Sequence, residues 1–386
     1  MVIHVLGIGD TAYNIHVLRK FIKKSKIDHI QFKNTKDEIY NDENLFFDSY
    51  KVLDQVKQLN SIKKNYDLFL VTGWSGARLA YLTNMRFVWI FNGDDIRHPF
   101  FVKDDFNQKK IIKRFFYRRV FDSVSASVAI YHDPYLDLKK YNHDPILIHA
   151  LVDTTLYNPD ISSLNLEKKK FTFFSPTRIS FFKGTDIIWN AIKACKNDFE
   201  VLQVNWYDEY PNYVKKKTEQ LFDQKPEQVK LIPMIKKSDI GKFYKYSDAI
   251  LGQMGVTGGI GGIEREAAAC GKAVITYANP NYKYELNDEF ISMPFIPKSK
   301  DPFELAKVID MIVLSKQFRD EYAKKCYNFI NTFHNPKKQA EKYDDVFENI
   351  VLNHKRQDSK LKQLIRKIFF ILAYYLDLKK IINKLF

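Results

Sequence analysis

The amino-acid sequence predicts an α/β protein with two doubly wound domains, each a parallel β-sheet covered by helices on both faces. Short apolar runs recur along the chain without the polar alternation of a half-exposed strand, and longer helical patterns separate them. The chain has 386 residues, which is more than one ordinary core needs and enough for two domains of about 150–190 residues. Its 45% hydrophobic and 28% charged residues are typical of a globular protein.

The predicted strands fall into two series, and each series predicts one sheet. The first series is Val2–Leu6, Leu68–Thr72, Phe87–Phe91, Ser127–Ile130 and Ile146–His149. The second series is Phe171–Ser175, Phe199–Val204, Val229–Ile232, Ala249–Leu251 and Ala273–Tyr277. Helices are predicted over Asp301–Ser315, Gln317–Phe333 and Pro336–Asn353.

The two domains are expected to join within Asn158–Lys170, where Pro159 and a lysine run interrupt the strand pattern. We therefore expect an amino-terminal domain over 1–158, a carboxy-terminal domain over 165–352 and a basic tail over 355–386. In doubly wound sheets, ligands bind beyond the carboxyl ends of the strands. The loops that follow strands are therefore the places to look for function.

One such loop, Ser175–Asp186, carries two cations. Arg178 and Lys183 are five residues apart, and a glycine follows the lysine. Two cations in one loop can clamp a diphosphate, the guanidinium as a fork and the ammonium as a point charge. On spacing alone, a solvated loop with two ordinary charges is the simpler interpretation.

A second loop, within Gly252–Gly271, is rich in glycine and leads into an alanine-rich helix. Five glycines lie between Gly255 and Gly262, and Glu264 and Glu266 follow. Glycines before a helix N-terminus let an anion approach backbone N–H groups. A buried Glu at the start of that helix can accept hydrogen bonds from a ribose diol. The alternative is a flexible turn whose carboxylates only complement the helix dipole.

A third loop follows Phe87–Phe91 and gathers polar side chains. Asn92, Asp94 and Asp95 surround Gly93 there, which suits a sugar or acceptor site. The alternative is a helix start with one of the aspartates as its N-cap.

The turn after the first strand contains Gly7 and Gly9. A dinucleotide fingerprint needs a third glycine and an acidic residue at the end of the second strand, and neither is present. The sequence therefore argues against NAD binding and favours a glycine turn at the ligand edge of the sheet.

Five segments, in this order along the chain, resemble segments of the family 4 (group 1) retaining glycosyltransferases. They are FNGDDIR (91–97), HALVDTTLYNP (149–159), TRISFFKGTDIIWNAI (177–192), FYKYSDAIL (243–251) and GGIGGIEREAAACGKAVI (258–275). The resemblance covers about residues 1–350. It implies the GT-B fold, in which two Rossmann-like domains face an interdomain cleft.

The resemblance also implies a donor site in the second domain. Its residues would be Arg178 and Lys183 for the diphosphate, Glu266, Gly258, Gly261 and Gly262 for the ribose and sugar, and Met234 and Ile235 for the base. On the acceptor side, Asn92, Asp94 and Asp95 would be the catalytic candidates.

Two positions depart from the family pattern. Gly258 stands where the first Glu of the family's Glu-x7-Glu motif is expected, and Asn92 stands where the family has a His. Glu264 is two residues from Glu266 along a helix and would point elsewhere. Asp94 or Asp95 is a candidate to replace the His. These departures keep open a catalytically silent relative that only binds nucleotide sugars.

The activity that the resemblance implies is transfer of a sugar from a nucleoside-diphosphate sugar to an acceptor, with retention of the anomeric configuration. Neither a metal nor a separate cofactor is expected, because the two cations and a helix N-terminus neutralise the leaving diphosphate. The leaving phosphate itself would take the acceptor's proton. The expected acceptor is a lipid-linked or surface glycan.

The net charge is +15, and much of it lies in the tail. Residues 355–386 carry nine Lys or Arg and two Asp, a balance of 9 − 2 = +7. Leu361, Leu364, Ile365, Ile368, Leu372 and Tyr375 recur there at helical spacing, and the apolar core is too short to span a bilayer. The tail therefore predicts contact with an anionic membrane surface, with docking onto the first domain as the alternative.

A second basic segment, Asn107–Arg119, combines six cations with three aromatic residues and is a further candidate for membrane contact. Its alternative is an ordinary surface helix. No nucleic-acid-binding motif is present, so nucleic acid is not an expected partner. Three widely spaced cysteines and the lack of a signal-peptide pattern predict a cytoplasmic protein, free or peripheral on the inner face of the cell membrane.

Overall fold

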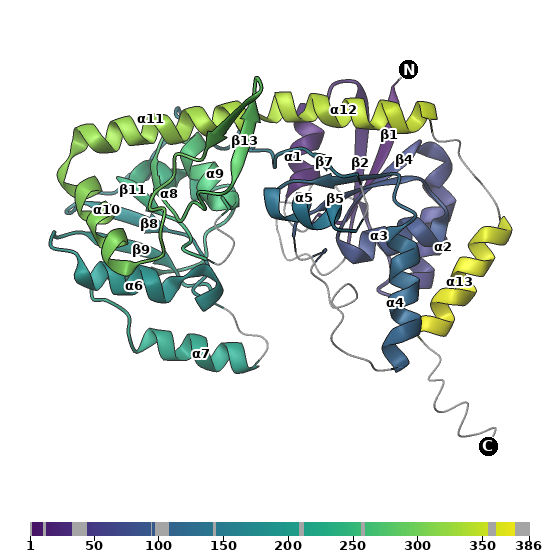
Figure 1. The fold of residues 1–386 in the computed structure, drawn as a ribbon, viewed down its shortest axis with the longest axis horizontal. Helices are drawn as coiled ribbons and strands as arrows, with labels where there is room; N and C mark the ends of the chain where they lie inside the picture. Colours follow the sequence, from purple (N-terminus) through teal and green to yellow (C-terminus); the bar gives the residue numbers. More distant parts are fainter. Residues whose placement is uncertain are drawn as a thin grey trace. The chain divides into compact units, whose positions relative to one another are not determined.

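The computed structural model describes residues 2–10, 13–32, 45–93, 95–96, 108–141, 144–207, 212–255, 259–353 and 360–374. The chain forms two compact α/β units (Figure 1). Unit 1 comprises Met1–Leu151 and Pro336–Phe386, and unit 2 comprises Val152–Asn335.

Unit 1 is built on a seven-stranded parallel sheet with the order β3-β2-β1-β4-β5-β6-β7. Its strands are β1 (Ile3–Ile8), β2 (Ser25–Gln31), β3 (Leu45–Phe46), β4 (Leu68–Thr72), β5 (Phe87–Phe91), β6 (Ala126–Ala129) and β7 (Ile146–Leu147). Its helices are α1 (Asn14–Phe21), α2 (Val52–Ile62), α3 (Gly73–Thr83), α4 (Gln108–Phe121), α5 (His132–Lys139), α12 (Pro336–Asn353) and α13 (Lys360–Tyr374), with a short 3-10 turn, η2 (Lys63–Asn65).

Both faces of this sheet are buried, which is why its strands read as continuous apolar runs. In β5, Trp89 packs on one side with the helices α3 and α4, whereas Val88 and Ile90 pack on the other side with α1 and α12. All five residues of β5 are buried. A strand buried on both faces has no position that faces solvent, so no polar residue interrupts the apolar run at Val88, Trp89 and Ile90.

Strand β2 was not expected from the sequence. It lacks an apolar run because buried His29 and Gln31 occupy core-side positions. The antiparallel hairpin of β13 (Lys283–Leu286) and β14 (Glu289–Ser292) in unit 2 was also not expected. Its strands are largely exposed, and its tight turn is formed by Asn287 and Asp288 with positive φ values of 51° and 64°.

Unit 2 is built on a five-stranded parallel sheet with the order β10-β9-β8-β11-β12. Its strands are β8 (Thr172–Ser175), β9 (Glu200–Val204), β10 (Val229–Ile232), β11 (Ala249–Leu251) and β12 (Ala273–Ile275). Its helices are α6 (Thr185–Ala194), α7 (Asn212–Phe222), α8 (Ile240–Tyr246), α9 (Gly262–Ala269), α10 (Pro302–Leu314) and α11 (Lys316–Phe333), with a 3-10 turn, η3 (Phe181–Lys183). The two parallel sheets with their helices confirm the doubly wound fold class.

The boundary between the units lies earlier than the sequence suggests. It falls between Leu151 and Val152 rather than within Asn158–Lys170. The reason is that Val152 and Tyr157 are buried in the core of unit 2. The chain then returns to unit 1 at Pro336.

The last two helices lie with unit 1, which corrects the assignment of residues 336–352 to the second domain. Tyr343 and Phe347 of α12 are fully buried against α1 and the first sheet. Asp344 of α12 accepts hydrogen bonds from the backbone N–H groups of Lys23 and Lys24, at 3.2 and 3.0 Å. These contacts hold α12 to unit 1.

Helix α13 of the basic tail packs beside α3 and α4 (Figure 1). Phe370 is buried in the core of unit 1, and Arg78 of α3 lies over its ring at 5.7 Å. The Arg366 guanidinium donates a 2.7 Å hydrogen bond to the carbonyl of Tyr81. The described part of the tail is therefore docked on unit 1. None of the described helices is both long enough and apolar enough to cross a bilayer.

Candidate functional site

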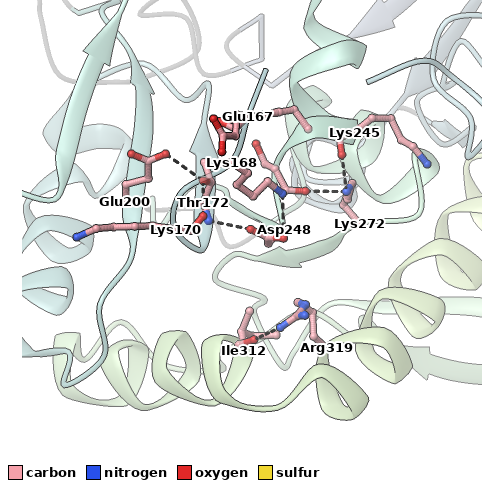
Figure 2. A network of polar contacts seen from close by, with 12 residues as sticks. Glu167, Lys168, Lys170, Thr172, Glu200, Lys245, Asp248, Lys272, Ile312 and Arg319 are labelled. Atoms are coloured by element: carbon pink, nitrogen blue, oxygen red, sulfur yellow. Dashed lines mark hydrogen bonds and ion pairs between the residues drawn. The ribbon is translucent and has the colours of Figure 1, made fainter. Parts of the chain in front are cut away.

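At the amino-terminal ends of the unit 2 strands, charged side chains form structural contacts (Figure 2). Asp248 accepts a 2.8 Å hydrogen bond from the backbone N–H of Thr172 and pairs with Lys168 at 3.0 Å. Lys272 donates to the carbonyls of Lys245 and Ser247 at 2.9 and 2.6 Å, and burial lowers its pKa to about 8. These charges join strand starts to helix ends, so they belong to the scaffold.

At the opposite, carboxyl ends, the loops after β8 and β11 pack directly on each other. The backbone N–H of Met254 donates a 2.9 Å hydrogen bond to the carbonyl of Lys183. Gly184 has φ +72°, and a Cβ there would lie 2.7 Å from the Met254 backbone. A Cβ on Gly255 would overlap the carbonyl oxygen of Phe182. Glycine at both positions is therefore what allows the two loops to meet.

Lys183 is linked through Gln253 to the glycine-rich loop. Its ammonium donates a 2.8 Å hydrogen bond to Gln253 Oε1, and the Gln253 amide donates to the carbonyl of Gly259 at 3.2 Å. The backbone N–H of Gln253 donates to buried Glu264 Oε1 at 2.8 Å. Lys183, the glycine loop and the first turn of α9 thus form one connected network.

Gly261 and Gly262 occupy the start of α9. A Cβ on Gly261 would lie 2.7 Å from Glu264 Oε2, which shows that Glu264 folds back onto this turn. Gly262 lies near Glu266 instead: a Cβ on Gly262 would be 3.8 Å from Glu266 Oε1. Glu264 and Glu266 therefore point to different places. Gly258, the third glycine expected here, lies outside the described residues.

Glu266 is buried and held by two donors. Lys237 forms an ion pair with Oε1, and the Tyr244 hydroxyl donates to Oε2 at 3.1 Å. Burial and the charge of Glu266 raise the pKa of Tyr244 well above its usual value, so this hydroxyl stays a donor. Tyr157 packs over the same group, with its ring 5.5 Å from the Lys237 ammonium. The carboxylate is therefore fixed in place before any ligand arrives.

Arg178 lies in the same post-strand loop as Lys183 but makes a different contact. Its guanidinium stands 5.6 Å from the centre of the Trp206 ring. The backbone N–H of Ile179 donates a 2.7 Å hydrogen bond to the carbonyl of Trp206, which joins the loops after β8 and β9. Trp206 itself is 43% exposed. An exposed indole beside a cation offers a flat surface at the edge of the loop after β8.

Met234 and Ile235, the residues expected near the base, lie in the loop after β10. Met234 is 61% exposed, whereas Ile235 packs partly against the unit 2 core. The same loop supplies Lys237, so it reaches the carboxylate of Glu266.

In unit 1, polar residues also gather at the carboxyl ends of the strands. Asn92 follows β5, and its backbone N–H donates a 3.2 Å hydrogen bond to Asp95 Oδ2. The Asn14 amide donates to Asn92 Oδ1 at 3.2 Å, and Trp74 donates to the carbonyl of Asp95 at 2.8 Å. The structure thus joins Asn92 and Asp95 to Asn14 and Trp74. Asp94 lies outside the described residues.

The two glycines of the first turn have different surroundings. Gly9 has φ +66° and lies in the turn, where a Cβ would approach the Phe32 ring to 2.9 Å. Gly7 lies inside β1, which corrects its assignment to the turn. A Cβ on Gly7 would lie 2.7 Å from Ile15, so this glycine lets α1 pack closely on the sheet.

The comparisons with known proteins agree with this geometry. Residues 158–329 match the family model of the group 1 glycosyl transferases. This match confirms the resemblance at the level of the group 1 glycosyltransferases for the segments 177–192, 243–251 and 258–275, which lie inside it. The matched segment contains the Lys183 loop, the glycine-rich loop and Glu266. A search of curated protein sequences finds no match.

Solved structures with the same fold include three proteins of low sequence identity. HepE from Anabaena, in complex with UDP and glucose, has a TM-score of 0.65 and 14% identity, covering 90% of this chain and 100% of HepE. Sucrose-phosphate synthase from Thermosynechococcus elongatus has a TM-score of 0.65 and 12% identity, with 91% and 99% covered. A proposed UDP-N-acetylglucosamine 2-epimerase from Listeria monocytogenes has a TM-score of 0.55 and 12% identity, with 92% and 98% covered. The chain therefore has the GT-B fold, and the fold alone does not choose the reaction.

Five residues that contact the predicted site residues were not expected from the sequence. They are Asn14, Trp74, Lys237, Tyr244 and Gln253. Gln253 is the one with a sequence signal, since it lies between a buried strand and the glycine-rich loop. Lys237 stands in a plain polar loop, and only the fold brings it to Glu266, 29 residues later.

Proposed function

We propose that this protein is a glycosyltransferase that moves a sugar from a nucleoside-diphosphate sugar to an acceptor. The observation that carries the proposal is that Lys183, linked to the glycine-rich loop through Gln253, and Glu266, held by Lys237 and Tyr244, both lie inside the segment that matches the group 1 family. A cation for the diphosphate and a fixed carboxylate for the ribose are the two contacts that such a donor needs. A uridine donor is the first to test, because HepE is known in complex with UDP-glucose.

The proposed chemistry depends on neutralising the leaving group. The acceptor hydroxyl oxygen bonds to the anomeric carbon while the bond from that carbon to the diphosphate breaks. Arg178 and Lys183 stabilise the negative charge that develops on the diphosphate, and no metal is needed for this step. The acceptor's proton passes to the leaving phosphate oxygen on the same face of the sugar, so the configuration is retained, as in family 4 enzymes.

Glu266 accepts hydrogen bonds from the ribose hydroxyls in this proposal. Lys237 and Tyr244 already hold its two oxygens, so they act as positioning residues and set the direction of the remaining lone pairs. Gly261 and Gly262 offer backbone N–H groups to the donor, and the exposed Met234 contacts the base together with the backbone near Ile235.

The acceptor side is assigned to the polar cluster of unit 1. Asn92 and Asp95 are proposed to contact the acceptor there, with Asp94 beside them in the sequence. We propose a lipid-linked or surface glycan as the acceptor and a cytoplasmic location on the inner face of the membrane. The basic tail supports this location.

A second candidate is a catalytically silent relative that binds nucleotide sugars. It is favoured by Asn92, which stands where the family has a His and whose carbonyl oxygen is engaged by Asn14. A silent relative would show donor binding without turnover or donor hydrolysis.

The test is a thermal-shift screen with UDP, GDP, ADP and their common sugar conjugates. A ligand at about 100 times its dissociation constant should stabilise the native protein by about 2.7 kcal/mol. Lys183→Ala and Arg178→Ala should abolish the shift, whereas Lys193→Ala, an exposed cation on the neighbouring helix α6, should leave it unchanged. A shift that is equal in all four proteins would remove the donor-site assignment, and no shift with any nucleotide would remove the proposed function.

A further inference from the structure

Helix α13 docks on unit 1 with the face opposite to its apolar stripe. The docked face contains Gln363, whose amide donates to the Thr83 carbonyl at 2.5 Å, together with Arg366 and buried Phe370. The α13 stripe, defined as the outward apolar residues at helical spacing, consists of Leu361 (67% exposed), Leu364 (55%), Ile365 (56%), Ile368 (49%) and Leu372 (37%). An amphipathic helix that packs in the core normally buries such a stripe. Here it remains on the surface.

The stripe continues onto helix α4, which comes from the second basic segment. Phe115 of α4 is 52% exposed, and its ring meets Phe369 of α13 edge-on, with centroids 5.6 Å apart. The two basic segments of the sequence therefore form one surface (Figure 1). Contiguous exposed apolar side chains on this scale mark a contact surface rather than scattered surface residues.

A pocket of about 340 Å³ opens between α4 and α13 beside this stripe. Its lining, hereafter the cationic pocket, consists of Tyr81, Arg119, Asp122, Ser123, Lys362, Ile365 and Arg366. The carboxylate of Asp122 is paired with Arg118 at 2.9 Å. Arg119 and Lys362 are exposed, and Arg366 is fixed by the Tyr81 carbonyl. Three cations around one hollow suit a phosphate group, whereas the Ser123 hydroxyl already donates to the Val120 carbonyl at 2.7 Å.

We propose that the α13 stripe and the cationic pocket together bind the surface of an anionic phospholipid bilayer. The pocket receives a lipid headgroup phosphate, and the stripe lies in the boundary between headgroups and acyl chains. The charge of the surface selects this partner, because basic residues surround an apolar face that is too short to span a membrane. The proposal specifies the part of unit 1 that supports the peripheral location proposed above, and it does not depend on the donor site.

Sedimentation of the full chain with vesicles tests the proposal. Vesicles of phosphatidylcholine with phosphatidylglycerol should bind the protein, and vesicles of phosphatidylcholine alone should bind it much less. Arg119→Ala and Lys362→Ala should each weaken binding about fivefold, the usual effect of one cation near an anionic surface. The double variant Ile365→Ser with Ile368→Ser should weaken it at least about tenfold, since two large apolar side chains no longer enter the boundary.

Matched controls lie elsewhere on unit 1. Lys57→Ala removes an exposed cation from α2, and Leu352→Ser removes a 75% exposed leucine from α12, and both should bind vesicles like the unchanged protein. Equal binding by the variants and controls would overturn the proposal. So would equal binding to both vesicle types, capture of inorganic phosphate without vesicle binding, or a dimer that the stripe variant disperses. The nucleotide thermal shift, measured on the same variants, separates failure of this surface from failure of the donor site.

Discussion

The contact between the loops after β8 and β11 can be broken by adding single methyl groups. Gly184→Ala places a Cβ on a residue with φ +72° and 2.7 Å from the Met254 backbone. Gly255→Ala places one against the carbonyl of Phe182 at a position without a positive φ. Gly271→Ala is the matched control, because it has φ +74° but its nearest heavy atoms are 4.0 Å away, on Pro159.

The expected costs follow from these geometries. A left-handed φ costs an alanine roughly 1–2 kcal/mol relative to glycine. Forcing an extra carbon into a packed contact costs about 1–3 kcal/mol. Gly271→Ala should therefore lower the stability only by the cost of the left-handed φ. Gly255→Ala should lower it only by the cost of the packed contact. Gly184→Ala should lower the stability by both amounts, roughly 2–5 kcal/mol in all, and should displace the loop after β8.

Calorimetry and nucleotide titration measure the two consequences. For a unit of this size, each kcal/mol lowers the melting temperature by about 2–4 °C. UDP affinity should fall at least about tenfold in Gly184→Ala and Gly255→Ala, since moving a binding loop by a few tenths of an ångström disturbs its charge-assisted hydrogen bonds. Gly271→Ala should bind UDP normally. If Gly184→Ala and Gly271→Ala had the same stability and the same UDP affinity, the reasoning about this loop contact would be refuted.

Three further predictions concern the carboxylate, the metal and the buried lysine. Glu266→Gln should weaken UDP binding at least about tenfold but leave pyrophosphate binding unchanged, because only UDP carries a ribose. The assay is a calorimetric titration, and the control is the exposed Glu304→Gln, which should bind both ligands normally. Turnover measured as UDP release should persist in EDTA, and complete loss restored by Mg²⁺ would contradict the proposed leaving-group stabilisation. Burial lowers the pKa of Lys272 from 10.5 to about 8, so between these values the unfolded state binds more protons. Urea unfolding should therefore show stability rising from about pH 8 to pH 10.5 relative to Lys272→Met, and parallel profiles would contradict this assignment.

The fold class was accessible from the sequence because both sheets are buried on both faces. Strands such as Phe87–Phe91 therefore read as uninterrupted apolar runs, and helices such as Pro336–Asn353 carry clear amphipathic periodicity. Which unit a helix joins is a different question. Tyr343 and Phe347 fit any apolar groove, and only the complete fold shows that the first sheet provides it.

The sequence predicts only part of the candidate site, because some of its residues carry no signal before the chain folds. Lys183 and Glu266 were selected as candidates because they lie in segments that follow strands and that also match family motifs. Lys237 was not, because an ordinary lysine in a polar loop gives no signal of the carboxylate it will meet. The tail shows the same limit: its apolar residues at helical spacing are visible in the sequence, but the face that docks on unit 1 is made by Phe370 and by two polar side chains, Gln363 and Arg366.

The return of α12 to unit 1 affects the order in which the protein can fold during synthesis. All seven strands of the first sheet are made within the first 151 residues, yet Tyr343 and Phe347, which cover part of one face, emerge from the ribosome much later. Unit 2 is one continuous segment and can close its core as soon as residue 335 is free. The part synthesised first is thus completed last. A chain that stops short of residue 336 would carry a finished second unit and a first sheet with one apolar face partly uncovered, which is a substrate for chaperones or for aggregation.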